Sequence, residues 1–470
     1  MFFKKFIVIP IALIFFLSAC SVNSADSHMN LYTASAEVQT EVSKTPQIPT
    51  ATAESMVITE PDTTEAEATT SHRLISIWDG EIDDSFEEGL GTLEYPYVIA
   101  SAAQLAYFAN YVNSGQAFEG EHYILSCDVS LVERPWTPIG THEHPFSGFF
   151  WGCSSTVSDI DVGEGHRYIY EDNRGDDYIY EYMGLFGYVE DAHIDSLRIQ
   201  RAYLQPELNN SSNDGYNNTF NVLYMGAIAG HVTSRAKQTV ISNCIVDGYS
   251  FLCSRGSLLT GVECSYVTGG IVGSISVYGQ NVVIRDCVAS GDTYITSLDE
   301  SSLDESTTGG IAGEVARSSS KNRCQINSCL ALGQIIIKDY PRYTAGGICG
   351  RCRCDFERSY SERGIIIDNC VAGTIIDAQS LSHYAGGLIG ESKGTTISNC
   401  IYLKHAETAA KKAIGNSTTH SDERQVAAYP VEAFLDSEKY NMSLGPFWMS
   451  SKFIRESGGA LYLDKMPDRN

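Results

Sequence analysis

The chain has 470 residues, which is too long for one ordinary compact domain but suits an elongated repeat body with flanking parts. It carries 58 acidic against 32 basic residues, a formal net charge of −26. Such a surface repels phosphate backbones and anionic lipid headgroups, so we expect no nucleic-acid partner.

The first twenty residues predict export. Lys4 and Lys5 precede a short apolar run, Phe6–Leu17, the arrangement of a secretory signal peptide. The run ends at Leu17-Ser18-Ala19-Cys20, which resembles a bacterial lipobox. That resemblance implies cleavage before Cys20 and acyl chains on its thiol, each buried CH₂ contributing about 0.8 kcal/mol to anchoring. The alternative is a plain signal peptide that contains a cysteine.

Residues 21–73 predict a disordered linker. They are rich in Ser, Thr, Glu and Pro, with almost no aromatic residues and no sustained apolar period. A flexible chain of this length spans on the order of 40 Å, enough to hold a folded body away from a membrane. No later stretch is long and apolar enough to span a bilayer, so the acyl anchor is the expected membrane attachment.

Residues 74–160 are expected to form an N-terminal α/β capping segment. Ser101 is a plausible N-cap of a helix that ends before Gly115. The apolar stripe of that helix is Leu105, Phe108, Ala109 and Val112. Strands are expected at His122–Leu125 and near Phe146–Trp151.

An internal repeat dominates residues 161–415. Its first half ends in the glycines Gly187, Gly230, Gly273, Gly313, Gly350 and Gly390, which are 43, 43, 40, 37 and 40 residues apart. Most copies read Gly-Gly-x-x-Gly, as in Gly269-Gly270-Ile271-Val272-Gly273. The second half ends in a recurring cysteine: Cys244, Cys287, Cys329, Cys370 and Cys400. A third short run follows a glycine, as Tyr249–Leu252 follows Gly248. Residues 416–470 are expected to form a C-terminal capping segment.

Each unit offers three short β-type runs and cannot bury its apolar face alone, so stacking is required. The expected fold is therefore all-β: a right-handed parallel β-helix with three strands per turn and one rung per unit. Like positions then lie about 5 Å apart, and the recurring cysteines stack as a buried column. The residues before them, Asn243, Asp286, Ser328, Asn369 and Asn399, are expected to form a polar ladder at a bend.

These repeats resemble the GLUG motif, a Gly-Leu-hydrophobic-Gly repeat whose clearest instance is Gly184-Leu185-Phe186-Gly187. The preceding region resembles the segment that often comes before GLUG units, in Tyr95–Ile99, Ala103–Leu105, Tyr111–Gly115, Trp136–Gly140 and Pro145–Gly148. The resemblance covers roughly residues 78–403. Units near 40 residues are longer than usual, which implies protruding loops, and Cys stands where Ser is common. The family implies bacterial surface proteins, some of them IgA-cleaving metalloproteases with a separate catalytic domain, and the motif itself carries no known catalytic residues.

Enzyme motifs match poorly. Gly-Gly-x-x-Gly recurs without a following helix, unlike a phosphate loop. A zinc protease needs His-Glu-x-x-His, and the chain offers only His142-Glu143-His144. Gly390-Glu391-Ser392-Lys393-Gly394 has the letters of a serine-hydrolase elbow, but β-type residues follow it, so we interpret it as a rung loop.

Metal and redox readings stay open as alternatives. Asp79-Gly80-Glu81-Ile82-Asp83-Asp84 departs from the EF-hand pattern but leaves an irregular calcium loop conceivable. Cys349 falls at an apolar repeat position, which leaves Cys352 and Cys354 as a thiol pair or metal fragment. We expect no cofactor, no metal and no catalytic residue.

The sequence therefore predicts a lipid-anchored, extracytoplasmic binding or adhesion protein that recognises an extracellular glycan or host protein and is not an enzyme. A β-helix polysaccharide lyase or glycoside hydrolase is the first alternative, and a structural surface spacer is the second. A groove with carboxylates and a basic residue across adjacent rungs would favour the enzyme, whereas exposed Tyr or Trp would favour binding. The 27 tyrosines serve as strand residues or ligand contacts, and sequence alone does not separate these roles.

Overall fold

The computed structural model describes residues 75–206, 219–255, 262–297, 305–317, 321–338, 342–354, 364–378, 383–404, 409–419, 421–430, 454–457 and 460–463. All of them belong to the unit that spans residues 73–470. The signal peptide, Cys20 and the linker over 21–73 lie outside the described residues. Within the described part, no helix has the length and apolar character needed to cross a bilayer.

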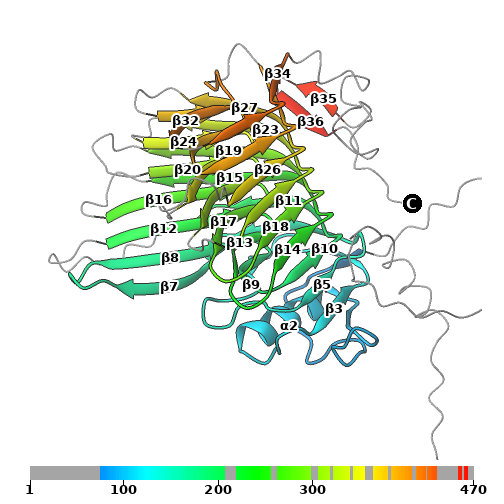
Figure 1. Ribbon diagram of the computed structural model, residues 1–470. Coiled ribbons are helices and arrows are strands. Elements are labelled where there is room, and N and C mark those ends of the chain that lie inside the picture. Colours follow the sequence, from blue (N-terminus) through cyan, green and yellow to red (C-terminus); the bar gives the residue numbers. More distant parts are fainter. Residues whose placement is uncertain are drawn as a thin grey trace, which may run out of the picture. The chain divides into compact units, whose positions relative to one another are not determined.

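The described unit is a parallel β-helix built from four stacked sheets (Figure 1). Sheet A contains, in spatial order, β1 (Ile75–Ile77), β4 (Asp128–Ser130), β6 (Thr156–Val162), β11 (Arg198–Leu204), β15 (Ile245–Arg255), β19 (Val288–Ser297), β23 (Leu330–Lys338), β27 (Val371–Ala378), β31 (Ile401–Leu403) and β34 (Ala427–Tyr429). Sheet B contains β2 (Tyr97–Ile99), β3 (His122–Leu125), β5 (Phe149–Trp151), β10 (His193–Asp195), β14 (Thr239–Ser242), β18 (Val282–Arg285), β22 (Cys324–Asn327), β26 (Ile365–Asp368), β30 (Thr395–Ser398) and β33 (Asp422–Arg424).

The other two long sheets have seven strands each. Sheet C contains β9 (Phe186–Glu190), β13 (Ala229–Ser234), β17 (Val272–Val277), β21 (Ala312–Arg317), β25 (Cys349–Cys354), β29 (Ile389–Lys393) and β32 (Ile414–Thr419). Sheet D contains β7 (His166–Glu171), β8 (Asp177–Met183), β12 (Thr219–Gly226), β16 (Val262–Gly269), β20 (Glu305–Gly309), β24 (Arg342–Gly346) and β28 (His383–Gly386). A separate antiparallel pair joins β35 (Ile454–Ser457) to β36 (Ala460–Leu463).

One repeat unit makes one rung, as the sequence predicts. Ala229 of β13 pairs with Val272 of β17, and Ile241 of β14 pairs with Ile284 of β18, so equivalent residues of consecutive units lie side by side. The pairing is parallel throughout these sheets except for β7, which runs antiparallel to β8.

The predicted number of three strands per rung is wrong. Each of the six repeat rungs has four strands, because a sheet D strand precedes every Gly-x-x-Gly turn. β20, for example, lacks an apolar run: it reads Glu305-Ser306-Thr307-Thr308-Gly309, yet Ser306, Thr307 and Thr308 are buried. Their hydroxyls find partners within the stack, since Thr268 Oγ1 lies 3.0 Å from Thr308 Oγ1. Hydrogen-bonded hydroxyls can be buried at little cost, so a search for apolar runs passes over them.

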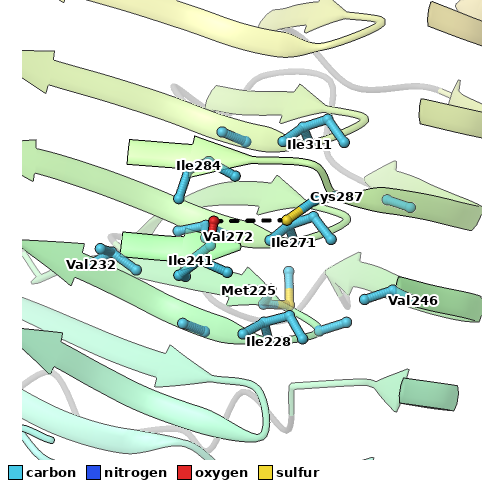
Figure 2. Packing of buried hydrophobic residues seen from close by; sticks show 14 of the residues in the cluster. Met225, Ile228, Val232, Ile241, Val246, Ile271, Val272, Ile284, Cys287 and Ile311 are labelled. Carbon is cyan, nitrogen blue, oxygen red and sulfur yellow. Dashed lines mark hydrogen bonds between the residues drawn. The ribbon is translucent and has the colours of Figure 1, made fainter. Parts of the chain in front are cut away.

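The cysteine column and the polar corner are both confirmed. The five recurring cysteines are buried, with exposed fractions of 0 to 1%. Cys287 packs among Ile241, Ile271 and Ile284, and its thiol points to the carbonyl of Ile241 (Figure 2). The residue before each cysteine has φ between 52 and 55°, the left-handed conformation that Asn and Asp tolerate best. That bend turns the cysteine inward and leaves the polar side chain at the corner.

Corner side chains bond from rung to rung. Asn243 Nδ2 donates to Asp195 Oδ1 at 2.7 Å, and Asn399 Nδ2 donates to Asp368 Oδ1 at 2.9 Å. At these two bends the corner amide binds a carboxylate of the neighbouring rung, which is the role expected of a ladder.

The N-terminal region supplies the predicted helix and further rungs. α2 (Ala102–Asn113) begins at Ser101, whose Oγ accepts a hydrogen bond from the amide of Gln104 at 3.0 Å. Its stripe of Leu105, Phe108, Ala109 and Val112 is buried, and Phe108 stacks on Phe150 of β5 with ring centroids 5.8 Å apart. The predicted strand His122–Leu125 matches β3, and β5 occupies the second half of Phe146–Trp151. The capping segment thus contributes strands directly to sheets A and B.

Candidate binding surface

Sheet D carries a patch of aromatic side chains on its outer face. Met183, Leu223 and Met225 of β8 and β12 are in the core, so the alternating residues between them point outward. We call this patch the tyrosine face: Tyr168, Tyr170, Tyr178, Tyr180, Tyr182, Phe220 and Tyr224. Its rings stack from strand to strand, with centroids 4.8 Å apart for Tyr178 and Phe220 and 6.1 Å apart for Tyr180 and Tyr224.

The outer faces of sheets C and D turn toward one another at the Gly-x-x-Gly corner. Tyr182 of β8 meets Tyr188 of β9 edge-on with centroids 5.1 Å apart, and Tyr224 of β12 lies 5.4 Å from His231 of β13. Outward side chains of two different sheets therefore form one aromatic cluster. The glycines allow this, because a Cβ on Gly230 would lie 2.6 Å from the amide nitrogen of Met183.

His231 forms part of the floor of this cluster and is 6% exposed. Burial, together with nearby His142 and Arg235, lowers the pKa of His231 to about 3, so the imidazole is neutral at physiological pH. Among the described residues, its Nδ1 has no hydrogen-bond partner. Burial first, and Glu190 second, raise the pKa of Tyr188 to about 12. The cluster therefore combines neutral aromatic rings with one unused polar atom.

An acidic pocket lies beside the tyrosine face. Its volume is about 240 Å³, and its floor includes Val112, Tyr123 and Phe146. Around that floor stand Phe118, Glu119, Glu143, His144, Glu190 and Asp191. Two cations from the β13–β14 connection reach it: Arg235 Nε lies 2.8 Å from Glu190 Oε2, and Lys237 Nζ lies 2.6 Å from Glu119 Oε1. Burial raises the pKa of Glu190 and Arg235 opposes that rise.

A second hollow, of about 410 Å³, lies farther along the stack and is polar. We call it the arginine pocket; it is lined by Glu305, Arg342, Tyr343, Thr344, Arg351, Tyr384 and Glu391. The Arg351 side chain is 6% exposed and forms ion pairs with Glu305 and with Glu391, the latter at 3.0 Å. Burial first, then Arg353, lower the pKa of Arg351 to about 10, against the pull of Glu391. Two carboxylates thus flank one guanidinium across neighbouring rungs.

The motifs singled out in the sequence do not converge on a catalytic site. Ser392 lies within strand β29, not in the loop that we expected, and is buried with its Oγ 2.7 Å from Ser421 Oγ. A nucleophile elbow needs an exposed hydroxyl at a strand-to-helix turn. His142 stacks on Tyr168 with centroids 3.7 Å apart, which makes it part of the aromatic surface.

The carboxylates of the Asp79–Asp84 motif and the thiols of the Cys349–Cys354 motif interact with neighbouring protein groups. Asp79 Oδ1 accepts the amide of Glu81, and Asp83 Oδ2 accepts the hydroxyl of Ser101. The described residues contain no group of three His, Cys, Asp or Glu side chains placed to hold a metal ion. Cys349 is in the core as expected, but its sulfur lies 3.5 Å from Cys352, whereas Cys354 contacts Arg317 Nη1 at 3.3 Å. The pairing of Cys352 with Cys354, which the sequence left open as an alternative, is therefore not formed.

The sequence does contain a signal for the tyrosine face. Tyr178, Tyr180 and Tyr182 recur with period two, which places all three on one face of a strand. Only the packing reveals that this face is the outer one.

The likeness to known proteins lies in the fold. A crystal structure from Bacteroides ovatus, provisionally described as an immunoglobulin A1 protease, matches with a TM-score of 0.52 and 17% sequence identity, over 81% of this chain and 95% of that chain. No protein-family model matches the sequence, and no curated protein matches it significantly. At 17% identity, the structural match is evidence for the stacked β architecture alone.

Proposed function

We propose that this chain is a surface-displayed binding or adhesion protein that recognises an extracellular glycan or protein through its tyrosine face. The observation that supports this most directly is the gathering of six tyrosines and one phenylalanine on the outer side of β7, β8 and β12. Tyrosine is rigid and amphipathic, so it contributes contact area at a low cost in conformational entropy. In a purely structural spacer the same rings would only pack against one another over the outer side of sheet D.

We also propose that the protein is an exported lipoprotein built from divergent GLUG-type repeats. The regular Gly-x-x-Gly corners support the repeat assignment, and the Leu17-Ser18-Ala19-Cys20 sequence supports the anchor. The structural neighbour is provisionally described as a protease, but this chain has no His-Glu-x-x-His sequence. We therefore carry over no protease activity.

A glycan-cleaving enzyme is the second candidate, and the arginine pocket favours it. Glu305, Arg351 and Glu391 bring two carboxylates and a cation together across rungs. Glycoside hydrolysis uses two carboxylates, of which one must give up a proton to the leaving group. Here both carboxylates pair with the same guanidinium, an arrangement that suits a structural ion network better than proton transfer. We rank binding first for that reason.

The experiment is a glycan and extracellular-matrix array probed with the full-length protein in detergent. A double variant, Tyr170→Ser with Tyr180→Ser, should weaken binding to any captured ligand by about tenfold or more, since tyrosines dominate such contacts. Tyr203→Ser is the matched control, because Tyr203 is exposed on β11 of sheet A. Equal loss in both variants, or release of shortened glycans that depends on Glu391, would contradict the binding assignment.

Replacement of Cys20 by alanine should abolish lipid attachment. Without the thiol no diacylglycerol can be added, so the protein should be secreted or stay uncleaved. Metabolic labelling with a fatty-acid analogue and membrane fractionation measure this. Ser18→Ala is the control, since it changes a neighbouring residue and keeps the thiol. Unchanged lipid labelling of the Cys20→Ala protein would refute the anchor.

A further inference from the structure

The tyrosine face and the acidic pocket are continuous. His142 stacks on Tyr168 of the face and meets Tyr188 edge-on at 5.3 Å, and the next residue, Glu143, lines the pocket. Arg235 connects the same two regions, because it pairs with Glu190 in the pocket and hydrogen-bonds to Tyr188, whose ring meets Tyr182 of the face edge-on. A ligand that covers one region therefore reaches the other.

This combined surface is strongly acidic. Four carboxylates line the pocket: Glu119, Glu143, Glu190 and Asp191. At the far end of the tyrosine face, the β7–β8 hairpin holds Glu171, Asp172, Asp176 and Asp177, with Arg174 as its single basic residue between them. The whole chain has 58 acidic and 32 basic residues, so the long-range field has the same sign. Anionic ligands are repelled here and cationic ones are attracted.

The cations already present indicate which charge the pocket accepts. Arg235 and Lys237 pair with Glu190 and Glu119, yet both basic side chains remain 57% exposed. Exposed ion pairs contribute about 0–1 kcal/mol, so an incoming cation can replace them at little cost. The apolar floor beneath the carboxylates suits the aliphatic stem of a lysine or arginine. Cationic groups are also attracted to the faces of tyrosine rings.

The open strand edge beside the tyrosine face favours a polypeptide over a sugar. Phe118, which lines the pocket, is 73% exposed and offers an apolar contact to a bound segment. In the described part of the chain, β7 is also the last strand of sheet D, where an extended segment could pair.

We propose that the tyrosine face and the acidic pocket together form a docking surface for a basic polypeptide segment, with a lysine or arginine side chain seated in the pocket. This inference rests on the proposed binding function and specifies its partner class.

The test is fluorescence anisotropy with the full-length protein and two labelled 15-residue peptides that alternate leucine with lysine or leucine with glutamate. The lysine peptide should bind, more weakly at high salt, and the glutamate peptide should not. Glu119→Gln with Glu143→Gln should weaken binding by about tenfold. The control, Glu133→Gln with Glu423→Gln, removes the same charge from exposed sites elsewhere and should bind like the parent. Circular dichroism checks that each variant is folded.

The outcomes separate this inference from the proposed function. Equal weakening by the control variant would show attraction by net charge alone and would overturn the docking surface. Binding of a glycan, lost in Tyr170→Ser with Tyr180→Ser, without binding of the lysine peptide would overturn the partner class and leave the binding function in place. Failure to find any ligand whose binding depends on the tyrosine face would overturn both the proposed binding function and the docking surface.

Discussion

Replacement of Gly269 by alanine is expected to lower the free energy of unfolding by about 3 kcal/mol or more. Gly269 ends β16 at the corner where sheet D turns into sheet C. A Cβ there would overlap the carbonyl oxygen of Val272 and lie 2.6 Å from the amide nitrogen of Gly313 on the next rung. Both obstacles are backbone, so no rotamer change relieves them. The overlap can be relieved only if the rungs move apart, which would break the backbone hydrogen bonds to the rungs on both sides.

Denaturant titration followed by circular dichroism measures the effect, and Gly248→Ala is the control. Gly248 has φ 76° in β15, but a Cβ there meets nothing closer than 3.9 Å. That variant should cost only the strain of a left-handed alanine, about 1–2 kcal/mol. If the two variants were equally stable, close backbone approach at the corner would not be what requires glycine.

The regular spacing of glycines and cysteines along the chain was sufficient to predict that one repeat unit forms one rung. Equivalent glycines and cysteines recur in step, so consecutive units must stack with like residues side by side, as Ile241 and Ile284 do. The position of α2 could be predicted because its N-cap, Ser101, and its apolar stripe are both signals within the local sequence. In β16 and β20 the fourth strand was not predicted, because its burial depends on hydroxyl partners that the neighbouring rungs supply, as between Thr268 and Thr308.

The candidate surface was harder to predict, because its contacts join distant parts of the chain. The pairing of Arg351 with Glu391 spans 40 residues and follows only from the register of β25 and β29. The contact of Tyr182 with Tyr188 depends on the angle between sheets D and C, which no local pattern encodes. The acidic pocket needs loops from three regions to converge, and loop conformation is set by tertiary packing.

The cysteine column predicts a sharp division among the thiols. Besides Cys20, the chain has thirteen cysteines, none of which forms a disulfide in the structure, and of these only Cys127 and Cys153 are partly exposed. Burial raises the pKa of Cys253 and Cys324 well above the usual range, and of Cys244 in the column likewise. The reactive species is the thiolate, so both burial and a raised pKa protect these three residues. In Cys287 and Cys370 burial opposes ionisation, but hydrogen bonds with neighbouring cysteines lower the pKa, so these two are protected by burial alone.

Alkylation of the native protein should therefore modify Cys127 and Cys153 within minutes and leave the other eleven to react only as the fold opens. An opening free energy of about 5 kcal/mol slows their modification roughly 10³- to 10⁴-fold. Peptide mapping by mass spectrometry identifies the modified residues, and guanidinium chloride should expose all thirteen together. A variant with Cys127→Ser and Cys153→Ser should show no rapid phase. Rapid native modification of Cys244, Cys287, Cys329 and Cys370 would instead mean that the column faces solvent, and the core of the β-helix would have to be reassigned to its opposite face.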